Sequence, residues 1–480
     1  MKYKWDIICF ILITLTLPIF FYKLGQSSLS SWDEAWYADI SRTISQTGDL
    51  VNLTWNGSPY LDHPPFGFWV TALTFKIFGI NEFWARFPQA ISAVLSLFLV
   101  YLLGKELFNR LVGGVSALAL SSAFWFVNRA RSGNLDILLT LMFLLNFYLA
   151  FKAVKKQKYL LSLSLSLAAL FLTKTMVPFL ILPSLAVILW PIKNKAGKYL
   201  FISFGVFSVW FTYQTLTYPE FIHSYLDVGL RGVKVQTNFL SNLILTKTYL
   251  YNGIGRWFWP GILGLSLIIF LRQKRVLPLV IFVVLFLLPF IFSAKVQIWH
   301  LIPLYPFLIL SFFGGCWVLL SHNTEQLAAR SQYSVTRTFV QRYLAALLRG
   351  SSYGQYLYPK RYILFVATVI LSSYFYFNQI RQIWYQMIDI PRYISDEAIL
   401  SKEASKYSQR LLIDGDFNPA AAFYAQKTVS KIHRDELIGL FKSSAPFLLI
   451  TNDWRINEVQ IDPQSYKLIK KDRDKVLVLH

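Results

Sequence analysis

The stretch Lys4–Ser41, KWDIICFILITLTLPIFFYKLGQSSLSSWDEAWYADIS, joins an apolar block to a segment that carries three carboxylates within seven residues. The apolar block, Ile7–Tyr22, follows Lys2 and Lys4 in the manner of a signal peptide, but it lacks a small-x-small cleavage site. We therefore interpret it as a retained membrane anchor. Because about 20 apolar residues cross a bilayer as a helix, the sequence predicts a span that leads directly into an acidic loop at the membrane surface.

Similar apolar blocks recur along the 480-residue chain, which is 55% hydrophobic and only 15% charged. A soluble domain carries roughly 25% charged residues. We count eleven apolar spans, near residues 6–23, 84–104, 112–128, 136–151, 159–173, 176–191, 199–217, 258–271, 276–293, 300–320 and 362–380. The sequence therefore predicts a polytopic α-helical membrane protein with about 11 transmembrane helices (11–13).

The formal net charge of +22 is distributed unevenly over the loops between these spans. With the N-terminus inside, the inner segments hold 20 of the 47 Lys and Arg residues, opposed only by Asp6, Glu106 and Glu325. Cytoplasmic loops of membrane proteins carry such an excess of positive charge. The basic excess is therefore a topology signal, which argues against nucleic acid as a partner and places the acidic loop outside.

The first outer loop, residues 24–83, is too long for a simple connection. Trp36, Ile40 and Ile44 recur at intervals of four residues, which predicts an amphipathic helix on the membrane surface. The segment PPFGFWVTALTFKIFG predicts a second such helix, with prolines at its start.

The composition changes from about Pro391 onward. The segments RLLIDGD and PFLLITND read as strands, NPAAAFYAQ as the start of a helix, and KVLVLH as a final strand. We therefore divide the chain into a transmembrane domain, residues 1–385, and a small soluble α/β domain on the outer face, residues 386–480.

The predicted topology brings polar residues from distant segments to the outer membrane surface. They are Asp33 and Glu34 after the first span, Asp62 and His63 in YLDHPPFGFW, Asp136 at the mouth of the fourth span, Lys174 between the fifth and sixth, Arg231 in the long outer loop, and Lys295 and His300 at the mouth of the tenth. Two prolines after Asp62 and His63 fix the backbone there. In such a group, Lys and Arg bind a lipid phosphate and an Asp accepts a proton from a hydroxyl. This chemistry suggests displacement at a sugar anomeric carbon, with a lipid phosphate leaving.

Each residue also has a simpler interpretation. Carboxylates cap and stabilise helix N-termini, lysines extend to the membrane interface, and buried histidines are commonly structural, which we favour for His300. Arg231 is equally well explained as a solvated loop residue. For the whole chain, the rivals are a transporter or lipid flippase and a non-catalytic assembly subunit. Transporters place ionisable groups near the bilayer midplane within repeats, whereas these acids gather at one surface and no repeat is visible.

The segment from SSWDEAWYADIS to YLLGKELF, Ser30–Phe108, resembles the N-terminal part of the bacterial branch of the dolichyl-phosphate-mannose protein mannosyltransferase family. That branch includes the aminoarabinose transferases that modify lipid A, which are integral-membrane glycosyltransferases of the C-type fold. The resemblance is strong through about residue 180, weakens through the middle, and is only architectural in the tail.

The resemblance implies roles for individual residues. The acidic pair Asp33-Glu34 with Tyr37 matches the first-loop motif of the family and makes Asp33 the candidate base. The segment Tyr60–Pro65 matches the acidic–basic–Pro-Pro motif, with His63 where lysine is common. Asp136 matches the acid that begins the fourth span, and it would shape the site together with Asp62. The implied substrate-binding residues are Glu34, Tyr37, Tyr60, His63, Lys174, Arg231, Lys295 and His300.

The predicted function is therefore that of an inverting membrane glycosyltransferase. It would move a sugar from a polyprenyl-phosphate donor to a lipid, glycan or protein acceptor on the outer face of a bacterial inner membrane. Some relatives bind a divalent metal through the acid of the double-proline motif and a loop histidine. His223 is the one histidine in a suitable loop, so the metal requirement stays open.

Overall fold

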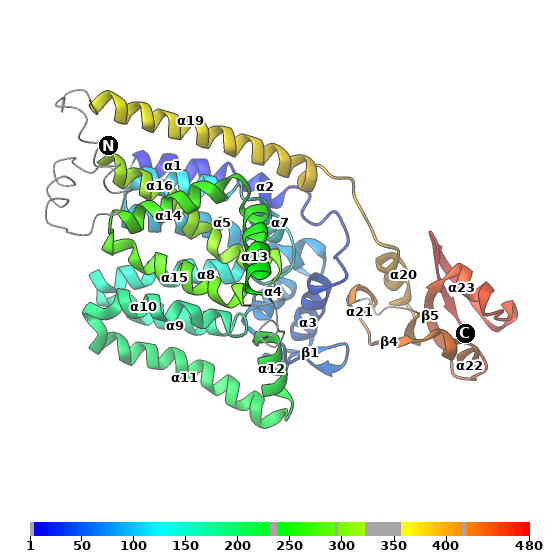
Figure 1. The fold of residues 1–480 in the computed structure, drawn as a ribbon. Helices are drawn as coiled ribbons and strands as arrows, with labels where there is room; N and C mark the ends of the chain where they lie inside the picture. Colours follow the sequence, from blue (N-terminus) through cyan, green and yellow to red (C-terminus); the bar gives the residue numbers. More distant parts are fainter. Residues whose placement is uncertain (1–3, 231–237, 293–295, 322–356, 415–418) are drawn as a thin grey trace.

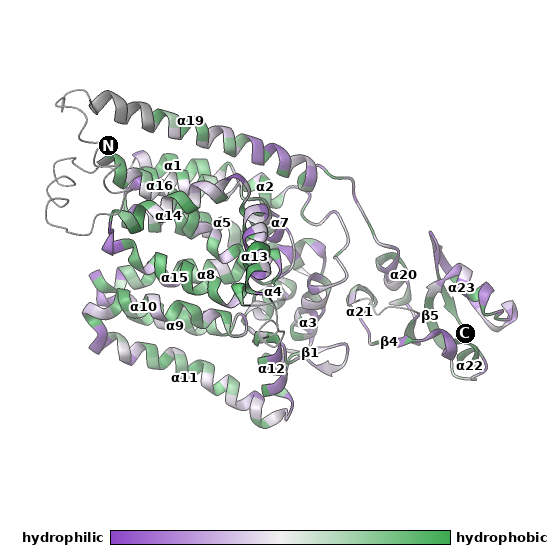
Figure 2. Ribbon diagram, viewed as in Figure 1, coloured by the Kyte–Doolittle hydropathy of each residue, from purple (hydrophilic) through white to green (hydrophobic). Residues whose placement is uncertain are grey.

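The computed structural model describes residues 4–230, 238–292, 296–321, 357–414 and 419–480. It consists of a helical bundle and a small sheet domain beyond one end of that bundle (Figure 1). The bundle helices are α1 (Lys4–Thr14), α2 (Leu17–Phe21), α5 (Glu82–Leu107), α6 (Arg110–Leu120), α7 (Phe124–Ala130), α8 (Asp136–Lys155), α9 (Leu160–Phe171), α10 (Leu182–Leu189), α11 (Lys193–Thr217), α13 (Phe239–Ile254), α14 (Phe258–Phe270), α15 (Leu277–Ile291), α16 (Tyr305–Ser321) and α19 (Leu357–Ile383). Their mainly hydrophobic character is visible in Figure 2.

Seven segments of the described chain are long and apolar enough to cross a membrane, or eight if α6 and α7, which are bent by 69°, form one span. The seven are Lys4–Phe21, Glu82–Leu107, Asp136–Lys155, Val177–Thr217, Phe239–Phe270, Lys274–Ile291 and Ile298–Leu320. This is fewer than the eleven to thirteen expected. Two expected spans fall within Val177–Thr217, and the span expected at 159–173 corresponds to a shorter apolar helical segment. The protein is a polytopic helical membrane protein, with seven to eight candidate spans among the residues that the structure describes.

The bundle core is built from close helix contacts and aromatic side chains. An added Cβ at Gly264 of α14 would lie only 2.2 Å from the Cα of Phe312 in α16, so a residue without a side chain is needed there. Deeper in the bundle, fully buried phenylalanine rings pack with centroids between 4.8 and 5.9 Å apart, within the range that favours aromatic pairs. These rings belong to Phe143, Phe147, Phe282, Phe286 and Phe307.

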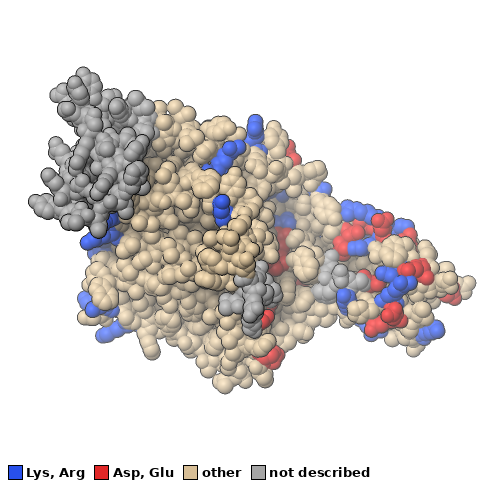
Figure 3. Space-filling model, viewed as in Figure 1, with Lys and Arg blue, Asp and Glu red and all other residues tan. Residues whose placement is uncertain are grey.

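The two ends of helix α8 carry different charged groups. Asp136 begins the helix, whereas Lys152 and Lys155 lie in its last turn and pair with Glu106 of α5. Twenty helical residues span about 30 Å, so these groups lie at opposite ends of the bundle. Figure 3 shows few charged side chains on the band between the ends.

The end of the bundle that carries Asp136 is covered by short elements from residues 24–83. They are α3 (Asp33–Thr47), the hairpin of β1 (Thr54–Trp55) and β2 (Ser58–Pro59), and α4 (Phe66–Phe78), joined by α12 (Phe221–Leu230). Both helices predicted in the first loop are therefore present. Helix α3 places Asp33 in its first turn.

The C-terminal domain is a five-stranded mixed sheet with helices. The order is β4 (Val429–Ile432), β3 (Arg410–Asp414), β5 (Phe447–Asn452), β7 (Lys475–Leu479) and β6 (Lys467–Asp472). Strand β3 pairs in parallel with β4 and β5, whereas β7 pairs antiparallel with β5 and β6. Its helices are α20 (Asp396–Ala404), α21 (Pro419–Ala425), α22 (Leu437–Phe441) and α23 (Asp453–Glu458). The three strands and the helix predicted from the sequence are all found.

Candidate active site

A cavity of about 470 Å³ opens at the loop-covered end of the bundle. Its walls come from α3, the loop before α4, the start of α8, the turn after α9, α12, α15 and the segment that leads into α16. The lining residues are Asp33, Tyr37, His63, Asn134, Leu135, Asp136, Leu139, Lys174, Thr175, Val177, Val228, Gly229, Phe290, Gln297, Trp299 and His300. Six residues selected from the sequence thus face one cavity, although up to 267 positions separate them in the chain.

Asp136 is the centre of the charged wall of this cavity. Its side chain is only 5% exposed, and Lys174 Nζ lies 2.8 Å from Oδ1. Arg129 Nε lies 3.5 Å from the other carboxylate oxygen. The position of Asp136 at the N-terminus of α8 also favours a negative charge. Two cations therefore meet one carboxylate, so the three groups together carry a net charge of +1. Lys174 lines the cavity, whereas Arg129 pairs with Asp136 without being a lining residue.

Arg129 is a site residue that the sequence analysis did not select. Its guanidinium lies 4.1 Å from the centroid of the Trp299 ring and 6.0 Å from that of Trp125. Cations over indole faces are attracted by the ring electrons, so these rings hold the guanidinium beside Asp136. The sequence does contain a pattern that could have identified Arg129, because it belongs to the same polar segment, NRARSGNLD, as Asp136.

Tyr37 stands among three carboxylates. Burial raises the pKa of Tyr37 well above its ordinary value, and the negative charges of Asp33, Asp136 and Asp62 raise it further. Asp33 and Tyr37 both line the cavity from α3, one helical turn apart. The phenol therefore stays protonated over the whole working pH range and can donate a hydrogen bond.

The double-proline segment supports the cavity from one side. His63 lines the cavity and is 8% exposed, with the Tyr37 ring 6.0 Å away in an edge-on arrangement. Asp62 lies beside the cavity, where it accepts a hydrogen bond of 3.0 Å from Ser224 of α12. Tyr60 is buried and packs edge-on against Phe68. His63 of this motif thus lines the cavity, and the hydrogen bond of Asp62 connects the motif to α12.

Glu34 points away from the cavity, although it is adjacent to Asp33. Its buried carboxylate pairs with Arg86 of α5 at 2.7 Å and accepts the backbone N–H groups of Ser30 and Gly133 at 2.8 and 2.9 Å. Burial alone would raise the pKa of Glu34, but the charge and hydrogen bonds of Arg86, with those backbone donors, lower it below its ordinary value. Glu34 therefore fixes the start of α3 to the bundle.

The remaining predicted residues lie at the cavity edge or outside the described chain. His300 Nδ1 accepts the backbone N–H of Gln297 at 3.4 Å, and both side chains line the cavity. Arg231 and Lys295 lie outside the described residues. In the part of the chain that the structure describes, no group of three or more His, Cys, Asp or Glu side chains is arranged to hold a metal ion, and His223 lies in α12.

Comparisons with known proteins agree with this architecture. Residues 62–213 match the family model described as dolichyl-phosphate-mannose-protein mannosyltransferase. An Aquifex aeolicus protein is 29% identical over 62% of this chain and 62% of its own length. The undecaprenyl phosphate-alpha-4-amino-4-deoxy-L-arabinose arabinosyl transferase of Pseudomonas savastanoi is 33% identical over 27% of this chain. The aligned region spans only 25% of that relative's length.

The fold is shared over nearly the whole chain. The crystal structure of ArnT from Cupriavidus metallidurans bound to undecaprenyl phosphate matches with a TM-score of 0.71 at 16% identity, covering 100% of this chain and 98% of that one. The matched family region includes Asp62–Pro65 of the double-proline motif, Asp136 and Lys174. Residues 62–213 of this chain are therefore similar to the dolichyl-phosphate-mannose-protein mannosyltransferase family.

Proposed function

We propose that this protein is an inverting membrane glycosyltransferase that moves a sugar from a polyprenyl-phosphate carrier to a cell-envelope acceptor. The observation that supports this most directly is the single cavity lined by Asp33, Tyr37, Asp136 and Lys174. A proton acceptor and phosphate-binding cations are the two groups that such a transfer requires. The names of the relatives, which include undecaprenyl phosphate, point to undecaprenyl phosphate as the carrier.

In this proposal Asp33 is the general base. It accepts the proton of an acceptor hydroxyl as the hydroxyl oxygen attacks the anomeric carbon from the face opposite the phosphate. The bond between the anomeric carbon and the phosphate oxygen breaks, and the phosphate leaves with the electron pair. Lys174 and Arg129 stabilise the charge that develops on that oxygen, because hydrogen bonds between ionised partners are the strong ones. Asp136 orients both cations.

We also propose how the chain lies in the membrane. The basic groups at the far end of α8 favour a cytoplasmic position for that end. In this proposal the cavity and the C-terminal domain lie on the extracytoplasmic face of a bacterial inner membrane. The chain would cross the membrane eleven times and would consist of a transmembrane domain, residues 1–385, and a C-terminal domain, residues 386–480. Helices α3 and α4 would lie on the membrane surface. The acceptor is a lipid, a glycan or a protein.

Replacing Lys174 with glutamine should weaken the binding of undecaprenyl phosphate to the purified protein in nanodiscs. The loss should be about 10- to 100-fold in Kd, the size expected for one charge-assisted hydrogen bond. The matched control is Lys76→Gln, an exposed lysine of α4 at the same end of the bundle. Equal affinities for both variants would contradict a phosphate-binding role for Lys174.

The transfer itself is tested with undecaprenyl-phosphate-linked mannose and undecaprenyl-phosphate-linked 4-amino-4-deoxy-L-arabinose, offered together with a bacterial envelope extract. We expect release of undecaprenyl phosphate and a mass increase of one sugar on an extract component. Movement of the intact carrier between liposome leaflets without cleavage would instead support the transporter alternative.

A further inference from the structure

The C-terminal domain packs directly against the start of α3. Helix α21 contacts α3, and one buried apolar cluster draws residues from both parts of the chain. The cluster consists of Leu29, Ala35, Ala38, Phe75 and Ala85 on the bundle side, and Ala398, Ala420, Phe423 and Tyr424 from the C-terminal domain. The domain is therefore in contact with the helix that carries the candidate base.

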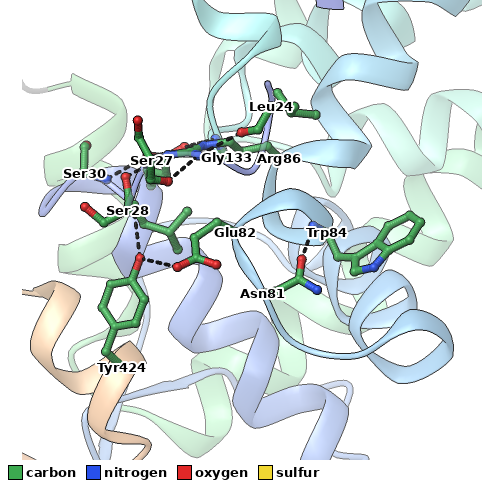
Figure 4. A network of polar contacts seen from close by, with 12 residues as sticks. Leu24, Ser27, Ser28, Ser30, Asn81, Glu82, Trp84, Arg86, Gly133 and Tyr424 are labelled. Carbon is green, nitrogen blue, oxygen red and sulfur yellow. Dashed lines mark hydrogen bonds and ion pairs between the residues drawn. The ribbon is translucent and has the colours of Figure 1, made fainter. Parts of the chain in front are cut away.

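Tyr424 supplies the central polar contact of this interface (Figure 4). Its hydroxyl accepts the backbone N–H of Leu29 at 2.8 Å and donates to Glu82 Oε1 at 3.1 Å. Burial raises the pKa of Tyr424, and the charge of Glu82 raises it further. The hydroxyl thus keeps its proton and can make both bonds at once.

Asn56 supplies a second contact from the tip of the β1–β2 hairpin. Its side chain donates to the carbonyl of Val429 at 2.9 Å and accepts the N–H of the same residue at 2.8 Å. Asn56 has φ of 52°, a left-handed conformation that asparagine adopts more readily than most residues. The hairpin therefore pairs with edge strand β4 through a side chain.

The segment held by Tyr424 is held on its other side by Arg86. The guanidinium donates to the carbonyls of Leu24, Ser27 and Ser28 at 2.8 to 3.0 Å (Figure 4). It also pairs with Glu34. Residues 24–30 are thus fixed between the bundle and the C-terminal domain. Asp33 follows three residues after the end of this segment. The position of the segment therefore determines where the start of α3 lies relative to the cavity.

We propose that the C-terminal domain positions Asp33, and that Tyr424 is the positioning residue through which it acts. The inference rests on the proposed role of Asp33 and assigns a task to a domain that carries none of the residues lining the cavity. The domain holds residues 24–30 through the Leu29 amide, and Tyr393 and Ser395 add three hydrogen bonds to Ser27 and Ser28. Helix α3 transmits this constraint to the Asp33 carboxylate. Loss of the Tyr424 hydroxyl should therefore slow transfer without weakening the binding of the carrier.

The test compares Tyr424→Phe with Tyr466→Phe, a tyrosine of the same domain that packs on Phe441. Hydrogen exchange of the peptide 24–41 is measured in the full-length protein, with kcat and KM for whichever undecaprenyl-phosphate-linked sugar, mannose or 4-amino-4-deoxy-L-arabinose, the protein cleaves. For Tyr424→Phe we expect faster exchange in that peptide, kcat lower by about 3- to 10-fold, and KM changed by less than about twofold, as for one lost hydrogen bond remote from the donor. Tyr466→Phe should match the wild type.

Two results would overturn the proposal. Unchanged exchange in Tyr424→Phe would show that the hydroxyl does not hold residues 24–30, and faster exchange with unchanged kcat would show that their position does not govern Asp33. Asn56→Gly, which keeps the backbone conformation, is the second variant if Tyr424→Phe fails to fold. A parallel Asp33→Asn variant that still transfers sugar would remove the proposed base, whereas the exchange result would stand independently.

Discussion

Replacing Asp33 with asparagine should lower the rate of sugar transfer by about 10²- to 10⁴-fold, the usual contribution of a general base. The amide has nearly the same shape but cannot accept the proton of the acceptor hydroxyl. Binding of undecaprenyl phosphate should change little, because the cations of the cavity wall come from other segments. The measurement is initial velocity of undecaprenyl phosphate release, with carrier binding determined on the same preparation.

The matched control for Asp33→Asn is Asp49→Asn, which lies in the same segment, residues 24–83. Asp49 is exposed and accepts the backbone N–H groups of Val51 and Asn52, which an asparagine side chain can also accept. Its substitution should leave the rate unchanged. Near-normal turnover of folded Asp33→Asn protein would contradict the assignment of Asp33 as the base.

Replacing Arg86 with methionine should destabilise the protein by about 3–5 kcal/mol, the cost of breaking a buried ion pair from one side. The substitution leaves the Glu34 carboxylate buried without its cation and removes the donor shared by three backbone carbonyls. The effect is measured as the loss of thermal stability of the protein in detergent.

Arg110→Met gives the comparison for that result. Arg110 pairs with Asp6 at 3.0 Å, but its side chain is 32% exposed. Pairs that water can reach contribute about 0–1 kcal/mol, so this variant should be nearly as stable as the wild type. Equal losses for the two arginine variants would contradict the structural role assigned to the Glu34–Arg86 pair.

The same pair predicts a pH dependence of stability. The pKa of Glu34 is lower in the folded protein than the ordinary value of about 4.3. Its contribution is therefore fully present above that ordinary value and is lost as the pH falls through the folded-state pKa. Acid unfolding monitored by near-ultraviolet circular dichroism should shift to higher pH in Glu34→Gln, which no longer carries this charge.

Six of the residues selected from the sequence line one cavity, but the sequence did not resolve their contacts. Asp136 and Lys174 were expected at one membrane surface because each lies at the end of an apolar span, and they form an ion pair at 2.8 Å. Glu34 was grouped with Asp33, yet neighbouring residues on a helix do not face the same way. Which of the two enters the cavity depends on Arg86, a partner 52 positions away from Glu34 that no local pattern reveals.

The fold was predictable to a similar degree. Strands β3, β5 and β7 are apolar and were recognised, whereas β6, KLIKKD, is a polar edge strand and β4, VSKI, is only four residues long. Neither shows the alternation that marks a half-buried strand. The two counts of spans differ at Val177–Thr217, where the spans predicted at 176–191 and 199–217 fall in one apolar segment whose helices α10 and α11 are separated only by residues 190–192.

The pairing of Lys174 and Arg129 with Asp136 has a consequence for turnover under the proposed function. Cleavage turns the carrier from a phosphodiester with one negative charge into a monoester with a charge of about −1.5 to −2. Cations without a neighbouring carboxylate would therefore bind the product, the phosphate monoester, more tightly than the sugar-linked substrate. Asp136 is a resident anion that competes for the same cations. It thereby limits product inhibition and lets the used lipid return to the bilayer.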